Sequence, residues 1–115
     1  MSEKAVELFR ASIPIFQALS DSARQDIILL LAEKEPLTVN EIANESTLSR
    51  PAISHHLKIL RDQKLVQIEQ KGTQRYYSLA LNEAVELLKN LLATVESECL
   101  LGDERDEPRA ILYHR

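Results

Sequence analysis

Polar and cationic side chains suited to nucleic acid are spaced along one short segment that begins at Ser49. Arg50 can donate two hydrogen bonds to the O6 and N7 atoms of guanine, while Ser54 and His55 can contact bases or phosphates. Lys58 follows Ser54 by four residues, so a helix would present both on successive turns. The types and spacing of these residues therefore predict contact with DNA.

The charge of the chain is unevenly distributed. The 115 residues carry a formal net charge of −4, yet residues 49–79 contain six Arg or Lys and only two Asp or Glu. That segment is therefore at +4 and the remainder of the chain at −8. A basic surface on an acidic body is the electrostatic footprint of a nucleic-acid-binding protein.

The elements that would position this segment form a helix-turn-helix pattern. Thr38 and Glu41 match a capping box at the start of a short helix over residues 39–45, and residues 46–48 are expected to form a turn. Ser49 then caps a second helix, whose first turns can enter the major groove. We expect Thr38, at the start of the first helix, to contact DNA as well.

The second helix also has an apolar side that can attach it to a core. Pro51 suits its first turn, because the missing N–H has no helical partner there. Three residues at helical spacing form the predicted buried stripe: Ile53, Leu57 and Leu60. The back of the helix is thus predicted to be anchored while its other faces stay free for DNA.

A β-hairpin is predicted after this helix. Residues 65–70 and 74–79 are rich in strand formers and are separated by the turn Lys71-Gly72-Thr73. Lys71 at the tip and Arg75 on the return strand are expected to contact the DNA backbone or the adjacent minor groove. Tyr76 and Tyr77 should point to opposite faces of the hairpin.

Three further helices are predicted outside this core motif. The first covers residues 3–18, with Pro14 expected to kink or divide it. The second begins at a cap formed by Ser20 or Asp21 and ends before Pro36. The third is a long helix capped by Asn82.

The order of elements predicts a mainly α fold with a small two-stranded antiparallel β-wing, that is, a winged helix-turn-helix. Residues 1–98 are expected to form one DNA-binding and dimerisation domain. Residues 99–115 are expected to form a charged C-terminal tail.

The sequence resembles the ArsR/SmtB family of bacterial winged-helix repressors. The resemblance covers about residues 5–98 and rests on four runs: Ala18 to Arg24, Leu48 to Arg61, Leu65-Val66, and Gly72 to Leu79. It implies a homodimer on a palindromic operator, with DNA reading by Arg50, Pro51, Ser54 and His55 and with Ser49 at the helix start.

The terminal helices carry apolar stripes that a domain of this size has little room to cover internally. We expect these residues to form a dimer interface: Phe9, Ile13, Phe16, Leu88, Leu91, Leu92 and Val95. A two-fold dimer would place two reading helices about one turn of DNA apart, ~34 Å.

Effector sites found in relatives do not transfer to this chain. Some relatives place paired cysteines at or just before the second helix of the motif, but residues 40–49 here contain neither cysteine nor histidine. Others use Asp and His on the last helix, but residues 82–98 here contain no histidine. His55 and His56 point about 100° apart on a helix and cannot easily chelate together. We expect His55 to contact DNA and His56 to occupy a packing or boundary position. No resident metal and no cofactor are predicted, and the effector, metal or small molecule, is undetermined.

Two alternatives keep the same fold. One is a sensor, either of a metal bound by Cys99, Asp103 and His114 with a carboxylate such as Glu98, or of redox state through Cys99 alone. The other is a winged helix that binds a protein partner, which the basic segment 49–79 disfavours. An enzyme is not expected, since no nucleophile–base pair or phosphate-binding loop is present. No signal peptide or membrane span is recognised, so we expect a cytoplasmic protein without membrane contact.

Overall fold

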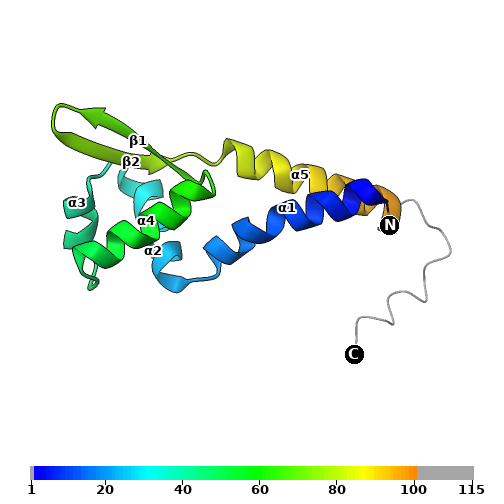
Figure 1. Ribbon diagram of the computed structural model, residues 1–115, viewed down its shortest axis with the longest axis horizontal. Helices are drawn as coiled ribbons and strands as arrows, with labels where there is room; N and C mark the ends of the chain where they lie inside the picture. The colour runs from blue at the N-terminus through cyan, green and yellow to red at the C-terminus, as the bar shows by residue number, and fades with distance from the viewer. Residues whose placement is uncertain (1, 101–115) are drawn as a thin grey trace. The chain divides into compact units, whose positions relative to one another are not determined.

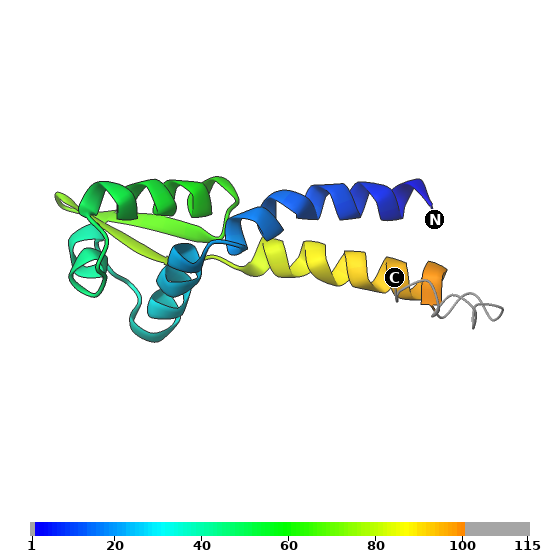
Figure 2. The ribbon, with the colours of Figure 1, turned by 90° about the horizontal axis from the view of Figure 1, so that it is seen from below.

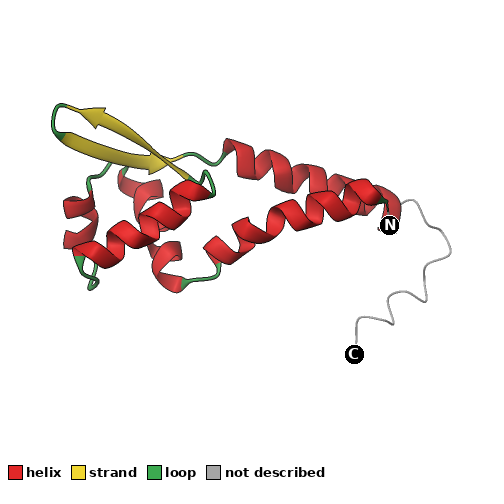
Figure 3. Cartoon of the chain, viewed as in Figure 1, coloured by secondary structure: helices red, strands yellow, loops and turns green. Residues whose placement is uncertain are grey.

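A computed structural model describes residues 2–100, with the side chains of residues 99 and 100 left out of the description. The elements, in order, are α1 (Glu3–Leu19), α2 (Ser22–Lys34), α3 (Val39–Asn44), α4 (Arg50–Asp62), β1 (Val66–Lys71), β2 (Gln74–Leu79), α5 (Asn82–Val95) and the π-helical turn η1 (Glu96–Leu100). Figure 1 shows them along the chain, and Figure 3 separates helices from strands. The predicted mainly α fold with a two-stranded antiparallel sheet is confirmed.

The chain forms two compact units. The larger one, residues 13–84, contains the helix-turn-helix and the hairpin. Its core is a set of buried residues contributed by α2, α3, α4 and the hairpin: Ile27, Leu31, Ile42, Ile53, Leu57, Leu60, Leu65, Val66 and Tyr77. The three residues predicted to anchor the back of the second helix of the motif all lie in this core.

The smaller unit combines the first residues of α1 with the residues after Ala84. These two segments lie side by side in Figure 2. Their ends are joined by Ser2, whose backbone N–H and hydroxyl donate to the two carboxylate oxygens of Glu98 at 2.9 and 2.7 Å. The hydrogen bond from the Ser2 hydroxyl, and to a lesser extent the one from its backbone N–H, lower the pKa of the Glu98 carboxyl. The division into domain and tail at residue 98 concerns residues that lie largely outside the described range.

Three polar caps determine where the helices begin. Asp21 caps α2 by accepting from the backbone N–H groups of Ala23 and Arg24 at 2.8 and 3.3 Å. Thr38 caps α3 and Ser49 caps α4, as the sequence predicts. α5 begins at Asn82 itself rather than after it.

Pro14 does not divide α1, which continues through it to Leu19. Of the two outcomes expected for this proline, division of the helix is therefore wrong. A proline inside a helix removes one hydrogen bond and costs about 3 kcal/mol. Ile15 and Ala18 are buried in the following turn, and burial of such side chains offsets a loss of this size.

The hairpin is formed by two paired strands and a tight turn at its tip. β1 pairs with β2 in antiparallel register from Val66 opposite Leu79 to Lys71 opposite Gln74. Gly72 at the tip has φ of +63°, a conformation that glycine adopts readily.

A short pairing with the segment before α3 was not predicted from the sequence. Leu37 and Tyr77 exchange two backbone hydrogen bonds of 3.0 and 2.7 Å. The backbone N–H of Leu79 also donates to Glu35 Oε1 at 2.6 Å. The base of the hairpin is therefore fixed to the segment before α3 by two backbone hydrogen bonds and one to a side chain.

Candidate nucleic-acid interface

α4 has a buried back and an exposed front. Its N-terminus is closed by Ser49, whose side chain accepts from the backbone N–H of Ala52 at 3.3 Å, and Pro51 lies in the first turn. Arg50, Ser54 and His55 are exposed on the front. Because the back is anchored in the core, the front can approach a groove without unpacking the helix.

α3 precedes α4 across a turn and is fixed by a complete capping box. The Thr38 hydroxyl accepts from the Glu41 N–H at 3.1 Å, and the Glu41 carboxylate accepts from the Thr38 N–H at 2.9 Å. Thr38 is half-buried, and its oxygen is already engaged in the cap. Its hydroxyl proton is the group that could still be donated to a phosphate.

The hairpin adds cations beside α4. Lys71 and Arg75 are both exposed, as a DNA contact requires. The ammonium of Lys71 lies 5.7 Å from the centre of the Tyr76 ring, a cation–π contact that steadies the long side chain. Tyr77 is buried while Tyr76 is only partly covered, as the alternation of a strand predicts.

A notch of about 280 Å³ separates α4 from β2. It is lined by residues of both elements: Ser54, Leu57, Lys58, Arg61, Asp62, Arg75 and Tyr77. Leu57 and Tyr77 are its buried apolar members. Three of the other side chains are cationic, so the notch has the charge and size to accept a phosphate group.

Arg61 is the residue of this surface that sequence reasoning counted in the basic segment but not among the DNA contacts. Its spacing could have identified it, because it follows Ser54 by seven residues and Lys58 by three. Those intervals place the three side chains along one side of α4.

The cations of this surface are largely uncompensated. Lys58 pairs with Asp62 at 3.1 Å, but both side chains are more than half exposed, so the pair is weak and can be broken by a phosphate. Within residues 2–100, no ion pair involves the remaining four: Arg50, Arg61, Lys71 and Arg75.

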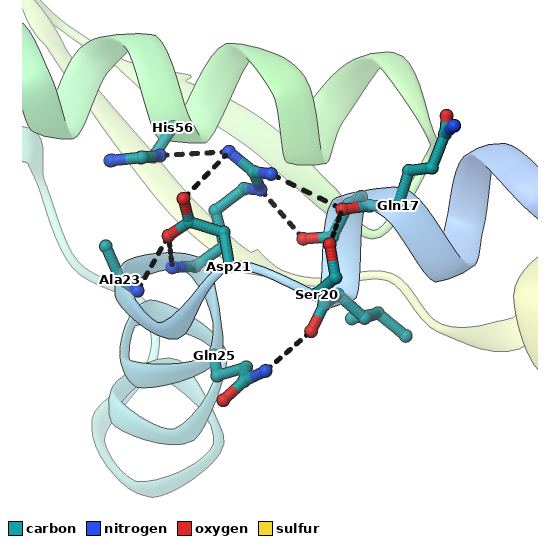
Figure 4. Close-up of polar contacts among 9 residues, drawn as sticks. Gln17, Ser20, Asp21, Ala23, Gln25 and His56 are labelled. Atoms are coloured by element: carbon teal, nitrogen blue, oxygen red, sulfur yellow. Dashed lines mark hydrogen bonds and ion pairs between the residues drawn. The ribbon is translucent and has the colours of Figure 1, made fainter.

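A polar contact attaches α4 to α2 on the side away from solvent. His56 is half-buried, and its Nδ1 atom lies 3.2 Å from Nη1 of Arg24 (Figure 4). The structure therefore places His56 at a boundary position, as expected. Desolvation opposes ionisation of the neighbouring Asp21, but the backbone hydrogen bonds from Ala23 and Arg24 outweigh it and lower the pKa of that carboxyl.

The residues predicted to form a dimer interface differ in exposure. In the smaller unit, Phe9 is 51% exposed and Leu92 is 68% exposed, whereas Leu91 is only 7% exposed and is packed within the chain itself. Leu88 and Val95 are half-buried. In the larger unit, Phe16 is 41% exposed and Ile13 is half-buried.

No group of three or more potential metal ligands is close together in the part of the chain that the structure describes. The Cys99 side chain, Asp103 and His114, which carry the sensor alternative, lie outside the described residues. None of the helices in the described range is long and apolar enough to cross a bilayer.

A reading helix with a buried back, a capped partner helix and a basic hairpin together define a winged helix-turn-helix DNA-binding domain of a transcription regulator. A family model described as bacterial regulatory protein, arsR family, matches residues 21–67. The arsenical resistance operon repressor of Bacillus subtilis is 34% identical over 95 residues, which cover 83% of this chain and 90% of that protein. The chain belongs to the ArsR family, a family of transcription regulators and not of enzymes.

Solved structures agree on the fold. An ArsR-like transcriptional regulator from Rhodococcus matches with a TM-score of 0.71 and 25% identity, covering 97% of this chain and 93% of that one. A winged helix-turn-helix domain from Mycobacterium bovis, described as homodimeric, matches with a TM-score of 0.64 and 23% identity, covering 86% and 91%.

Proposed function

We propose that this protein is a repressor that binds a palindromic operator as a homodimer and holds no resident metal. The observation that carries the proposal is the notch between α4 and β2, which is lined by the cations Lys58, Arg61 and Arg75. Arg50, at the start of the same helix, is exposed as well. The repressor role is supported by the name of the Bacillus relative. Dimerisation is supported by the homodimeric neighbour and by the exposed apolar side chains of α1 and α5.

Each part of the surface has a distinct role in this proposal. Arg50, Ser54 and His55 read base edges from the first two turns of α4. Arg61, Lys71 and Arg75 neutralise phosphates and fix the register, with Thr38, Ser49, Pro51 and Lys58 at the margin of the contact. Since the target is chromosomal DNA, we propose that the protein acts in the cytoplasm.

The test begins with selection of bound sequences from random DNA at a fixed salt concentration. We expect a palindromic site bound with nanomolar-range affinity, in line with the roughly 10⁻⁸–10⁻¹¹ M typical of specific complexes. The double variant Arg50→Ala/His55→Ala should lose the preference for this site over random DNA while keeping the same thermal unfolding curve.

Lys89→Ala is the matched control, because it removes one exposed helical cation that is not among the proposed contact residues. Its operator affinity should equal that of the wild type. Equal operator affinity in the Arg50/His55 double variant would refute the assignment of the reading face. Operator affinity that changes severalfold on addition of Zn(II), Cd(II), As(III) or peroxide would instead favour the sensor alternative.

A further inference from the structure

Arg24 joins three helices of the larger unit. Its Nε donates to the carbonyl of Ala18 at 2.7 Å, and its Nη2 donates to the carbonyl of Gln17 at 3.4 Å, so it satisfies two carbonyls at the end of α1. Its Nη1 contacts His56 of α4 at 3.2 Å, while Arg24 itself belongs to α2 (Figure 4). The Arg24 side chain is only 13% exposed.

The contact with His56 requires one protonation state. A guanidinium has only donor groups, so the Nδ1 atom of His56 must accept the hydrogen bond. His56 is therefore neutral, with its proton on Nε2. A second proton on the ring would occupy Nδ1, remove the acceptor and place an imidazolium against the Arg24 cation.

We propose that Arg24 and His56 are positioning residues that hold α4 in its DNA-binding orientation only while His56 is neutral, so that acidification weakens operator binding. The proposal rests on the operator binding proposed above.

Three charged or titratable groups lie near His56 and determine whether acidification weakens or strengthens operator binding. Arg24 opposes protonation of the ring, whereas Asp21, 3.9 Å from Arg24 Nη1, favours it. His55, with its ring centre 5.9 Å from that of His56, lies on the exposed front of α4. Protonation of His55 would strengthen attraction to DNA, so its effect on affinity is opposite to that of His56.

The test compares wild type with His56→Gln and His56→Leu, measuring operator affinity by fluorescence anisotropy from about pH 8 to about pH 5 at constant ionic strength. Glutamine can accept from Arg24 but does not titrate, and leucine can do neither. Because His55 is present in all three proteins, its contribution cancels in the ratios of dissociation constants.

We expect the wild type to lose affinity relative to His56→Gln by roughly three- to tenfold on acidification, the change that corresponds to the net contribution of one ordinary hydrogen bond. His56→Leu should be weaker than His56→Gln at every pH. A ratio of wild type to His56→Gln that stays constant with pH would overturn the proposal, as would equal affinities of the two variants.

A second measurement needs no DNA and separates this proposal from that of operator binding. Nitrogen NMR of the wild-type imidazoles should show His56 at about pH 8 with its proton on Nε2 and with Nδ1 accepting. Arg24→Gln should shift the Nδ1 resonance. A proton found on Nδ1 at that pH would overturn the proposal whatever the protein binds, whereas failure to select any operator would overturn only the proposed function.

Discussion

Arg61 and Arg75 both line one notch, the first contributed by α4 and the second by β2. Neither lies in the first turns of α4, from which we expect Arg50 to read base edges. A cation beside a small hollow is instead suited to a phosphate oxygen. Under the proposed function, we therefore expect the two arginines to contribute affinity that does not depend on the DNA sequence.

Replacing Arg61 or Arg75 with alanine should weaken binding to the operator and to random DNA by the same factor. Each variant loses one phosphate contact, so the slope of log affinity against log salt should fall in magnitude by about 1. A salt titration on both DNAs measures this. An unchanged slope, or a loss confined to the operator, would contradict the phosphate role.

At the scale of the helices and strands, the caps and turns that depend only on residues close together in the chain could be predicted from the sequence. The cap at Ser49, the capping box of Thr38 with Glu41 and the turn at Gly72 are all local patterns, and each is present. What could not be predicted joins distant segments. The Leu37–Tyr77 bridge and the Arg24–His56 contact depend on how elements pack, and no spacing rule specifies them.

The Asp21 cap makes the stability of α2 dependent on pH. The folded pKa of Asp21 lies below its ordinary value of 3.8, so its carboxylate contributes stability above that value and loses the contribution as pH falls through the folded pKa. Asp21→Asn keeps a good cap without a titrating group. We therefore expect urea unfolding to find the wild type more stable at neutral pH and the difference to shrink below about pH 4. A constant difference would show that the charge of Asp21 is not involved.

For the molecule as a whole, packing also decides which residues of the predicted dimer surface are exposed. The apolar periodicity of the terminal helices identified the stripe but could not distinguish Leu91, which is packed inside the chain, from Leu92, which is exposed. The two residues are adjacent on α5, and only their packing separates them. Leu92 is thus the better probe of assembly.

Leu92→Glu should convert the proposed dimer to a monomer, because a carboxylate cannot be buried there without a partner. Leu29→Glu is a closely matched control, since Leu29 is 67% exposed on α2 and Leu92 is 68% exposed. Sedimentation velocity should find a monomer for the first variant and a dimer for the second. The monomer should also lose affinity for the palindrome, because two half-sites can no longer be bound together. If the Leu92→Glu variant remained a dimer, Leu92 would not lie in the dimer interface and the proposed location would be wrong.

The pairing of Leu37 with Tyr77 fixes the base of the hairpin and leaves its tip without such a contact. The backbone N–H groups of Tyr77 and Leu79 are both bonded to the segment before α3, so we expect motion of the hairpin to be smallest there and to increase toward Gly72. Arg75 lies two residues from Tyr77, so under the proposed function we expect its phosphate contact to have a nearly fixed position. Lys71 lies beside the tip, so under the proposed function we expect its contact to tolerate operators whose flanking grooves differ in width.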